Sequence, residues 1–528
     1  MHANATPGLR AGPREWIGLA VLTLPCLLYS MDLTVLNLAV PHLSADLRPS
    51  SAQLLWIVDV YGFMVAGFLI TMGTLGDRIG RRRLLLAGAA AFGTASVLAA
   101  LSTSAGMLIT ARALLGVAGA TVAPSTLSLI RSMFADPRQR TVAISVWITS
   151  FSVGGAVGPL AGGVLLEWFW WGSVFLLAVP VMALLLVLGP ILLPEFRDPQ
   201  AGRLDLVSAG MSLAAVLAVV WGLKQLAQDG PGWAPALSVV AGSAVGAAFV
   251  RRQHALADPL LDLRLFRIPS FSAALTTNVL SFFVGFGALL FVAQYLQLVL
   301  GLSLLQAGLW MLPSSGGFIV GSMLTPVLAG RVRPGSVMAG GLGLAAVGFG
   351  LLTQLGSDHA AGLAVLVAGS VVFSLALAPV DTLATDLAVG SAPPERAGAA
   401  SAIAETSAEL GGALGIAILG VVGTAAYRGQ MAHALPAGVA PQAAAAARDT
   451  LGGAVAAAGQ LPDELGQALL DAARQAFTYG LHLAFAISAI AAVAVAVLAA
   501  VMLRRVRPSS ESHARLDPEG TQRTERQG

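Results

Sequence analysis

The chain has 528 residues, of which 56% are hydrophobic and only 11% are charged, and its mean hydropathy is +0.80. No compact soluble domain could bury that much apolar surface, so the composition excludes a soluble protein and indicates an integral membrane protein. The formal net charge is +3, but the basic residues are almost all arginines in short loops instead of a continuous basic stripe, which argues against nucleic acid as a partner.

Apolar runs long enough to cross a membrane, each needing about 20 residues, recur along the whole chain. We predict fourteen membrane-spanning helices, at 16–40, 54–75, 84–101, 106–130, 143–164, 171–193, 206–223, 236–250, 271–297, 303–329, 336–354, 360–389, 399–424 and 477–503. No small-residue cleavage pattern follows the first run, so we expect that run to be a retained span.

Most arginines lie in alternate loops between these spans, whereas the short loops on the other side offer only Arg48 and Lys224. Basic residues near the ends of spans resist translocation, so we expect the arginine-rich loops to be cytoplasmic. With an even number of spans, both termini are then cytoplasmic. The sequence thus predicts a multi-pass protein of the cytoplasmic membrane.

Residues 73–83 join the second and third apolar runs and form the most highly charged of these loops. They begin at Gly73 and include Asp77, Gly80 and four arginines, among them Arg78 and Arg81. So few residues cannot cross a bilayer, so the two helices must be antiparallel neighbours. We expect a charged cytoplasmic hinge between two helices.

An internal repeat divides the chain into two similar halves. Ala123-Pro124 returns as Ala378-Pro379, an offset of 255 residues, and the Gly154-Gly155-Ala156-Val157-Gly158 motif returns at 411–415, an offset of 257 residues. The hinge returns in a degraded form at 328–332. Because the matching spans run in the same direction, the repeat is parallel, with its axis along the membrane normal.

The predicted fold is all-α, with two six-helix bundles at 16–193 and 271–503 and two inserted helices with their flanking loops at 194–270. Residues 1–15 are expected to be a cytoplasmic N-terminus, and the polar residues 504–528 a disordered cytoplasmic tail. Within the second bundle, the external segment 425–476 is expected to be a small helical hairpin. A helix is expected to start at Pro462, followed by Asp463 and Glu464.

Charged groups inside the hydrocarbon cost about 2.5 to 3.5 kcal/mol or more each, so acids and bases at membrane depth are the first candidates for function. Asp32 and Asp59 on the first two spans and Arg112 on the fourth fall at similar depths and could share one cavity. An arginine favours the ionised acid and desolvation favours the neutral acid, so the balance can poise Asp32 to exchange a proton. The alternative is a structural salt bridge that fastens the first span to the fourth.

Four more acids lie on the spans of the second half. Glu405 and Glu409 are four residues apart and share one helical face. Two close carboxylates disfavour simultaneous ionisation, so this pair would hold one proton or attract a cationic substrate. Hydrogen bonding inside the bundle, or contact with cytoplasmic water, is an equal alternative. We expect Asp386 to be solvated at the interface, and Asp381 is left undecided.

The fifth span carries a stripe of small residues, namely Gly154, Gly158, Pro159, Gly162 and Gly163. Such a stripe leaves a groove in which a neighbouring helix can approach closely, and its proline bends the span. A special role for this groove and bend, and plain small-residue packing, are both consistent with this pattern.

Five aromatic residues, Trp56, Tyr61, Trp147, Tyr295 and Trp310, could line a cavity and offer ring faces to a lipophilic cation. Interfacial anchoring and core packing are the commoner roles of such residues.

The sequence carries no motif for cofactor or metal chemistry. Its one cysteine excludes internal disulfides and thiolate metal clusters, and it has no phosphate-binding loop, cluster of metal ligands, or paired nucleophile and base. We therefore expect neither a cofactor nor a metal, and no enzymatic activity.

These motifs together resemble the major facilitator superfamily, and within it the 14-span drug:proton antiporters that include the quaternary-ammonium efflux pumps. Residues 73–83 are similar to the superfamily's motif between spans 2 and 3, and residues 31–41 to that branch's span-1 motif. Residues 108–120 resemble the span-4 motif, 154–163 the antiporter motif of span 5, and 56–61 the same pumps. The resemblance covers nearly the whole chain.

The resemblance implies roles for individual residues. Asp32 would be a proton and cation site, Arg112 its partner in proton coupling, and Asp77 part of a cytoplasmic gate. Asp59 and Glu405 match acidic positions of the same pumps. In a two-half arrangement Asp77 would face the start of span 13 near 399, where the helix dipole favours an anion.

We expect a monomeric secondary transporter, embedded in membrane lipids, that exports lipophilic cations and is driven by the proton gradient. Span 10 lacks the acid that pumps for divalent cations can carry there, which favours monovalent cargo. Export of a neutral or zwitterionic natural product is the alternative. A substrate sensor or a membrane-embedded enzyme on the same scaffold would be a different class.

Overall fold

The computed structural model describes residues 10–197, 205–229, 232–256, 259–356 and 359–504, and within these ranges all regular secondary structure is helical. The first half consists of α1 (Pro13–Leu47), α2 (Ser51–Ile79), α3 (Arg81–Ala100), α4 (Ala105–Gly119), α5 (Val122–Met133), α6 (Pro137–Trp168), α7 (Ser173–Leu176) and α8 (Ala178–Leu192). The inserted helices are α9 (Leu206–Asp229) and α10 (Trp233–Ala255).

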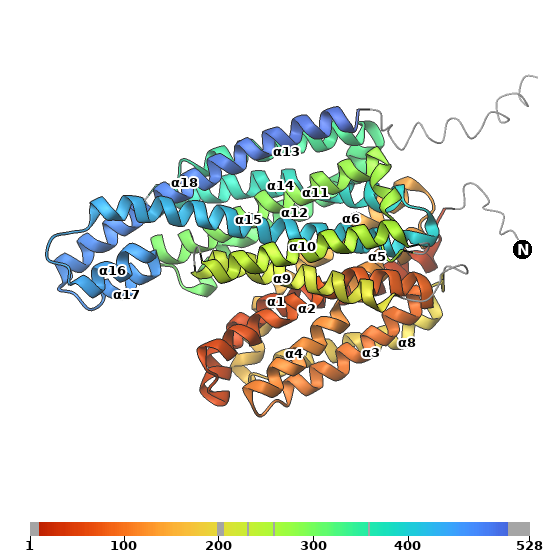
Figure 1. The fold of residues 1–528 in the computed structure, drawn as a ribbon, viewed down its shortest axis with the longest axis horizontal. Helices are drawn as coiled ribbons and strands as arrows, with labels where there is room; N and C mark the ends of the chain where they lie inside the picture. Colours follow the sequence, from red (N-terminus) through yellow and green to blue (C-terminus); the bar gives the residue numbers. More distant parts are fainter. Residues whose placement is uncertain (1–9, 198–204, 230–231, 257–258, 357–358, 505–528) are drawn as a thin grey trace, which may run out of the picture.

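The second half begins after a short 3₁₀ helix, η1 (Leu263–Arg267). It consists of α11 (Pro269–Gln294) with a π turn η2 (Tyr295–Val299), α12 (Leu304–Arg331), α13 (Pro334–Leu352), α14 (His359–Ser391), the 3₁₀ turn η3 (Pro394–Arg396), α15 (Ala397–Ala434), α16 (Pro441–Asp449), α17 (Leu451–Ala458) and α18 (Asp463–Met502). Figure 1 shows these helices running side by side along the length of the molecule.

The chain contains many helices able to cross a membrane. Over the described residues, thirteen segments are long and apolar enough to do so, and they correspond to the predicted spans 2 to 14. The first predicted span lies in α1, a helix of 35 residues that is not among these thirteen. The multi-pass character is therefore confirmed, while the count of fourteen and the side of the membrane on which each terminus lies stay predictions.

The two halves are separate bundles with matching internal packing. In the first half α1 packs along α6 and α2 along α4, and in the second half α11 packs along α15 and α12 along α14. The buried apolar side chains form one large cluster in each half and a smaller third cluster around α10, η1 and the start of α11. The halves meet where α2 contacts α15 and where α6 contacts α12.

Close helix contacts at glycine repeat between the halves as the sequence predicts. A Cβ on Gly154 of α6 would lie 2.2 Å from the Leu27 carbonyl oxygen of α1. A Cβ on Gly411 of α15 would lie 2.3 Å from the Val279 carbonyl oxygen of α11. Only glycine allows the two backbones to approach this closely.

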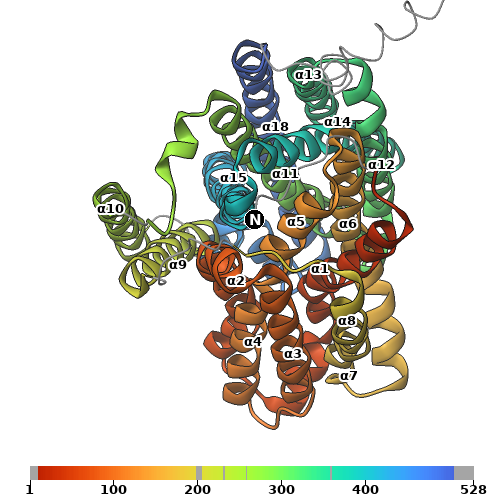
Figure 2. The ribbon, with the colours of Figure 1, turned by 90° about the vertical axis from the view of Figure 1, so that its right-hand side faces the viewer.

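The predicted hinge is far more helical than an eleven-residue loop. α2 runs to Ile79 and α3 starts at Arg81, so Gly80 alone separates the two helices. Its φ of +114° is a conformation that residues with a Cβ rarely adopt. We call the end of the bundle that carries Gly80 the hinge end and the opposite end the loop end; Figure 2 views the molecule from the hinge end.

Two predicted spans of the first half are interrupted. The fourth divides into α4 and α5 around Ala120 and Thr121, four and three residues before Pro124, which has no backbone N–H to donate to the preceding turn. The sixth divides into α7 and α8 at Leu177. These two spans are therefore built from shorter helical pieces than the sequence predicts, whereas α1, α2 and α6 are longer than their predicted spans.

At the loop end the predicted hairpin is built differently from expectation. α15 extends to Ala434 and α18 begins at Asp463, directly after Pro462, so the two spans themselves project into the 425–476 segment. The short helices α16 and α17 lie between them, and Tyr427 of α15 donates a hydrogen bond to the Ala447 carbonyl at 2.6 Å. The helix start at Pro462 is as predicted.

The inserted helices lie outside both bundles. α9 and α10 form an antiparallel pair, and α9 contacts both α2 of the first half and α15 of the second half. Figure 2 shows α9 beside α2 and α15, with α10 farther out. One inserted helix thus lies along an interface between the two halves.

Candidate transport site

Asp32 and Arg112 form an ion pair in the interior of the first half. Arg112 Nη1 donates to Asp32 Oδ2 at 2.9 Å, joining α4 to α1. The arginine side chain is 1% exposed and the aspartate side chain 14% exposed, so the pair is nearly withdrawn from solvent. The sequence predicts similar depths for these two residues, and the structure brings them into contact.

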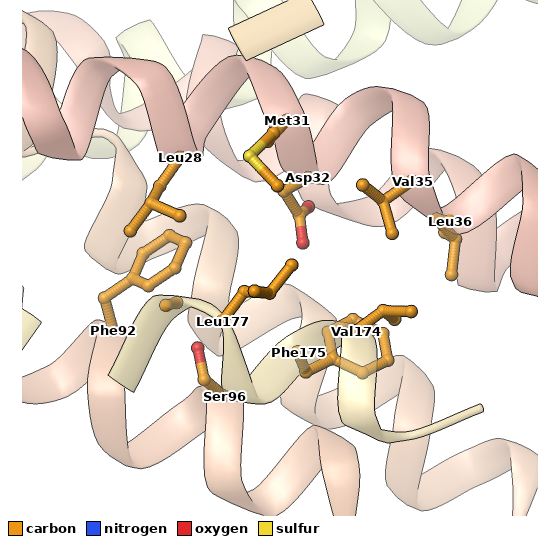
Figure 3. A pocket seen from close by; sticks show the side chains of 11 residues that line it. Leu28, Met31, Asp32, Val35, Leu36, Phe92, Ser96, Val174, Phe175 and Leu177 are labelled. Carbon is orange, nitrogen blue, oxygen red and sulfur yellow. The ribbon is translucent and has the colours of Figure 1, made fainter. Parts of the chain in front are cut away.

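A small cavity lies beside Asp32. It has a volume of about 20 Å³, room for about one water molecule, and its walls come from α1, α3 and the α7–α8 interruption. Figure 3 shows the Asp32 carboxyl directed from α1 into the space bordered by Val174 and Leu177. The carboxyl therefore faces the inside of the first half and not the second half.

Aromatic rings surround the arginine. The guanidinium carbon of Arg112 lies 5.2 Å from the Tyr61 ring centroid and 5.9 Å from that of Phe175, distances typical of cation–π contacts. Neither Arg112 Nε nor the Tyr61 hydroxyl has a hydrogen-bond partner among the described residues, although both are buried. Such groups cost free energy unless they are paired, so this ion pair is kept at a cost to stability.

Glu405 and Glu409 lie on the face of α15 that is directed toward the first half. The Tyr29 hydroxyl of α1 donates to Glu409 Oε1 at 3.3 Å. Glu409 is solvent-exposed even though it lies midway along a membrane-crossing segment, and Glu405 is half-buried. Tyr29, which no sequence motif singles out, thus brings an exposed acid of one half into contact with the other half.

Asp59 lies apart from Asp32 and has a different partner. Lys224 Nζ of α9 donates to Asp59 Oδ1 of α2 at 2.7 Å. The expected single cavity shared by Asp32, Asp59 and Arg112 is therefore divided into two separate ion pairs. The sequence predicts an external loop at Lys224, whereas the structure places this residue within α9.

The hinge contributes a charged contact between the halves. Asp77 of α2 accepts hydrogen bonds from the Gly398 N–H at 3.0 Å and the Ala399 N–H at 2.9 Å, so it caps the start of α15. An anion there is favoured by the helix dipole and by the free N–H groups. The position near Ala399 is the one that the resemblance to the superfamily implies.

Two neighbouring residues, Arg81 and Gly73, support this cap. Arg81 is 1% exposed and pairs with Asp77 Oδ1 at 2.9 Å, while Arg78 is half-buried. A Cβ on Gly73 would lie 2.5 Å from the Gly398 carbonyl oxygen, so a side chain there would separate α2 from α15. Gly73, Asp77 and Arg81 thus all lie at the interface between the halves.

An ion pair also joins the halves at the hinge end. Arg140 Nε of α6 donates to Asp386 Oδ1 of α14 at 2.6 Å, and the Thr141 hydroxyl donates to Asp386 Oδ2 at 2.7 Å. Asp386 is only 8% exposed, so the expectation that it is solvated at the interface is wrong. Asp381, between one and two turns earlier on α14, is also buried and accepts a hydrogen bond from the Ser281 hydroxyl of α11 at 2.5 Å.

The aromatic candidates are dispersed. Tyr61 and Trp147 are buried in the first half, where Trp147 Nε1 donates to Thr126 at 2.9 Å. Trp56 and Trp310 are more than 40% exposed, on α2 and α12 respectively. The structure therefore does not gather these rings around one cavity.

The small-residue stripe on α6 is only partly engaged. Gly154, Gly158 and Gly162 are buried, whereas Gly163 is exposed and a Cβ placed on it would have no other atom within 4 Å. The side chain of Pro159 lies outside the described part. Close packing against α1 is thus shown at Gly154.

Comparison with known proteins agrees with this architecture. The sequence profile described as the Major Facilitator Superfamily matches residues 23–416. The chain belongs to the major facilitator superfamily. It is accordingly a multi-pass protein of the cell membrane and a transporter, not an enzyme.

Its relatives within the superfamily include drug-efflux and resistance proteins. The chain is 45% identical over 503 residues to the multidrug efflux pump LfrA of Mycolicibacterium smegmatis, covering 95% of this chain and 99% of that one. It is 38% identical to the methyl viologen resistance protein SmvA of Salmonella typhimurium, covering 88% and 94%. It is 34% identical to the tetracenomycin C resistance and export protein of Streptomyces glaucescens, covering 97% and 95%.

Solved structures show the same fold. The human organic anion transporter MFSD10 superposes with a TM-score of 0.60 at 16% identity, covering 92% of this chain and 100% of that one. A bacterial homologue of the human lysosomal transporter Spinster gives a TM-score of 0.52 at 20% identity, covering 94% and 98%. This major facilitator transporter therefore has the fold expected from its sequence repeat.

Proposed function

We propose that this transporter is an antiporter that exports lipophilic, monovalent organic cations in exchange for protons, with its hinge end in the cytoplasm. The observation that carries the proposal is the Asp32–Arg112 pair, a carboxylate and a guanidinium 2.9 Å apart at membrane depth beside a water-sized cavity. A nearly buried carboxylate with one cationic partner and room for water can exchange a proton with little rearrangement. Intramembrane ionisable groups are functional by default.

Protonation of Asp32 would weaken its attraction to Arg112 and so loosen the link between α1 and α4. Coupling then follows if the two orientations of the transporter differ in their affinity for the proton and the cargo. In this scheme Asp77 and Arg81 hold the hinge end closed in one orientation. Glu405 and Glu409 offer negative charge to a cation held between the halves.

The choice of cationic cargo is supported by the acids and by one relative, whose name concerns resistance to methyl viologen. The alternative cargo is a neutral or zwitterionic natural product. The relative that is named for the export of tetracenomycin C supports this alternative. The two alternatives differ in their dependence on charge at Asp59 and Glu405. Only export of a cation is expected to fail when these acids become amides.

The test is accumulation of a labelled cationic dye by inverted membrane vesicles energised with a proton gradient. For Asp32→Asn we expect gradient-driven accumulation to fall at least about ten-fold, within the usual range of coupling between sites. Asp463→Asn is the matched control, because Asp463 is exposed at the loop end, and it is expected to accumulate dye normally. An Asp32→Asn transporter that still concentrates dye against its gradient would refute the coupling role of Asp32.

A further inference from the structure

The inserted helix α9 presents the chain's single lysine to an acid of the first half. Lys224 is the one lysine in a sequence with 30 lysines and arginines in total. Its ammonium lies 2.7 Å from Asp59 Oδ1 and 4.7 Å from the centroid of the Phe63 ring. A carboxylate and an aromatic face together are the chemistry that binds an organic ammonium ion.

This lysine is held near the surface and not in a sealed core. Its side chain is 36% exposed and that of Asp59 is 18% exposed. Both side chains keep part of their surface uncovered by protein, so an organic cation can reach the Asp59 carboxylate and the ammonium has room to move aside.

An aromatic cavity lies along the same two helices. It has a volume of about 270 Å³ and is lined by Trp56 and Phe63 of α2, Trp221 of α9 and Ser238 of α10, among others. This volume is slightly below the range of about 300 to 1,000 Å³ that is usual for small-molecule sites. Phe63 both lines the cavity and contacts the Lys224 ammonium, so the ion pair lies beside the cavity and shares the Phe63 ring with it.

The residue type at 224 suits a displaceable cation. An arginine forms two parallel hydrogen bonds with a carboxylate, whereas a lysine is a compact charge on a flexible stem with a single contact point. Other ion pairs of the chain use arginine, including those of Arg112, Arg140 and Arg252. At this one place, beside an aromatic cavity, the chain uses the more easily exchanged cation.

We infer that Lys224 competes with the cargo for Asp59. The lysine pairs with the Asp59 carboxylate when the site is empty, and an aromatic organic cation that binds between α2 and α9 displaces it. The inference rests on the cationic cargo proposed above and deepens it by naming a binding site and a competitor. It gives the inserted helices a part in substrate binding, because α9 supplies one wall and the competing charge.

The test is equilibrium binding of radiolabelled tetraphenylphosphonium, an aromatic monovalent cation, to the purified full-length protein. Lys224→Met removes the competitor and is expected to tighten binding about ten-fold, the combined order of an exposed ion pair and a cation–π contact. Lys224→Arg is expected to weaken binding, because a bidentate pair with Asp59 is harder to displace. The predicted order of affinity is methionine, lysine, arginine.

Two further variants isolate the cause. Adding Asp59→Asn to Lys224→Met is expected to abolish the gain, since the freed carboxylate is what attracts the probe. Arg252→Met is the matched control: it removes the cation of an Arg252–Asp205 pair on the same inserted helices, away from the cavity. It is expected to leave tetraphenylphosphonium binding at the wild-type level.

The outcomes separate this inference from the proposed function. If the wild type binds tetraphenylphosphonium but Lys224→Met binds it equally or more weakly, Lys224 is structural and the inference fails alone. If the wild type binds no organic cation at all, the cationic cargo itself is wrong. Lys224→Arg keeps the charge, so it remains informative even if Lys224→Met does not fold.

Discussion

The two halves of the transporter share their packing and differ in their charges. Gly154 meets the backbone of α1 as Gly411 meets that of α11. In the first half, the first and fourth spans are joined by the Asp32–Arg112 ion pair. In the second half, the matching helices α11 and α14 are joined by a neutral hydroxyl, that of Ser281, donating to Asp381. The repeat thus supplies the scaffold, and the polar residues distinguish one half from the other.

The largest expected effect tests whether the packing is equivalent in the two halves. Gly154→Ala and Gly411→Ala each place a methyl group 2.2 to 2.3 Å from a backbone oxygen, which forces two helices apart. We expect each variant to lose about 3 kcal/mol of folding free energy, at the upper end of the usual cost of overpacking. Thermal unfolding of the purified protein in detergent measures the loss.

Gly163→Ala is the control for this pair, because its methyl group would meet no atom within 4 Å. It is expected to unfold at the wild-type temperature. A large difference in stability between Gly154→Ala and Gly411→Ala would show that the halves are not packed equivalently.

An intermediate effect is expected at the hinge end, where the halves differ in charge. Asp77→Asn removes the negative charge that caps α15 and pairs with Arg81. A favourable, partly buried interaction of this kind contributes up to about 2 kcal/mol, so opening of the hinge end should become about ten-fold more frequent. Labelling of a thiol introduced by Ser401→Cys, a buried position one turn into α15, reports the opening.

The repeat supplies the matched control, since the position corresponding to Asp77 is Gly330, with open space around it. Gly330→Ala is expected to leave the labelling rate unchanged. The single native cysteine, Cys26, is buried and adds little background. Equal labelling in Asp77→Asn and the wild type would rule out Asp77 as part of a gate.

The smallest effect concerns the inserted helices, which have no counterpart in the repeat. Hydrogen bonds from the Ser208 hydroxyl and from Arg252 lower the pKa of Asp205 from 3.8 to about 2. A carboxyl with a lowered pKa stabilises the fold fully above its unfolded value, and this stabilisation disappears as the pH falls from about 4 to 2. Because the group is near the surface, we expect less than about 1 kcal/mol.

Unfolding temperatures measured across this pH range test the effect, with Asp205→Asn as the reference. The difference between wild type and variant should shrink as the pH falls. A difference that stays constant down to about pH 2 would show that the charge of Asp205 does not stabilise the inserted pair.

Much of the architecture follows from the sequence because hydropathy and loop arginines are local signals. Apolar runs locate the spans, and the repeated Gly154 and Gly411 motifs identify two parallel halves. The contact between Asp77 and the start of α15 was expected from the resemblance to the superfamily, and the attraction of a helix N-terminus for an anion gives its physical reason. The spans and the repeat need only composition and spacing.

The remaining contacts depend on how the helices assemble. Lys224 follows a predicted span directly, so the sequence places it in a loop. Only the packing of α9 against α2 reveals its partner Asp59. Asp386 is near a span end as well, and its burial depends on Arg140 from the other half. In the sequence, nothing distinguishes Tyr29 from its apolar neighbours. Its role in the contact with Glu409 follows only from the position of α15. Pairings between distant segments carry no local signal.

The length of α18 makes the molecule asymmetric across the bilayer. Its 40 residues extend about 60 Å at 1.5 Å per residue, roughly twice the thickness of the hydrocarbon. The start of α18, together with α16, α17 and the last turns of α15, therefore projects beyond the lipid on one side of the membrane. An antibody fragment raised against this projecting region would bind intact cells or everted membranes, but not both. Its binding would therefore establish the direction in which the protein is inserted.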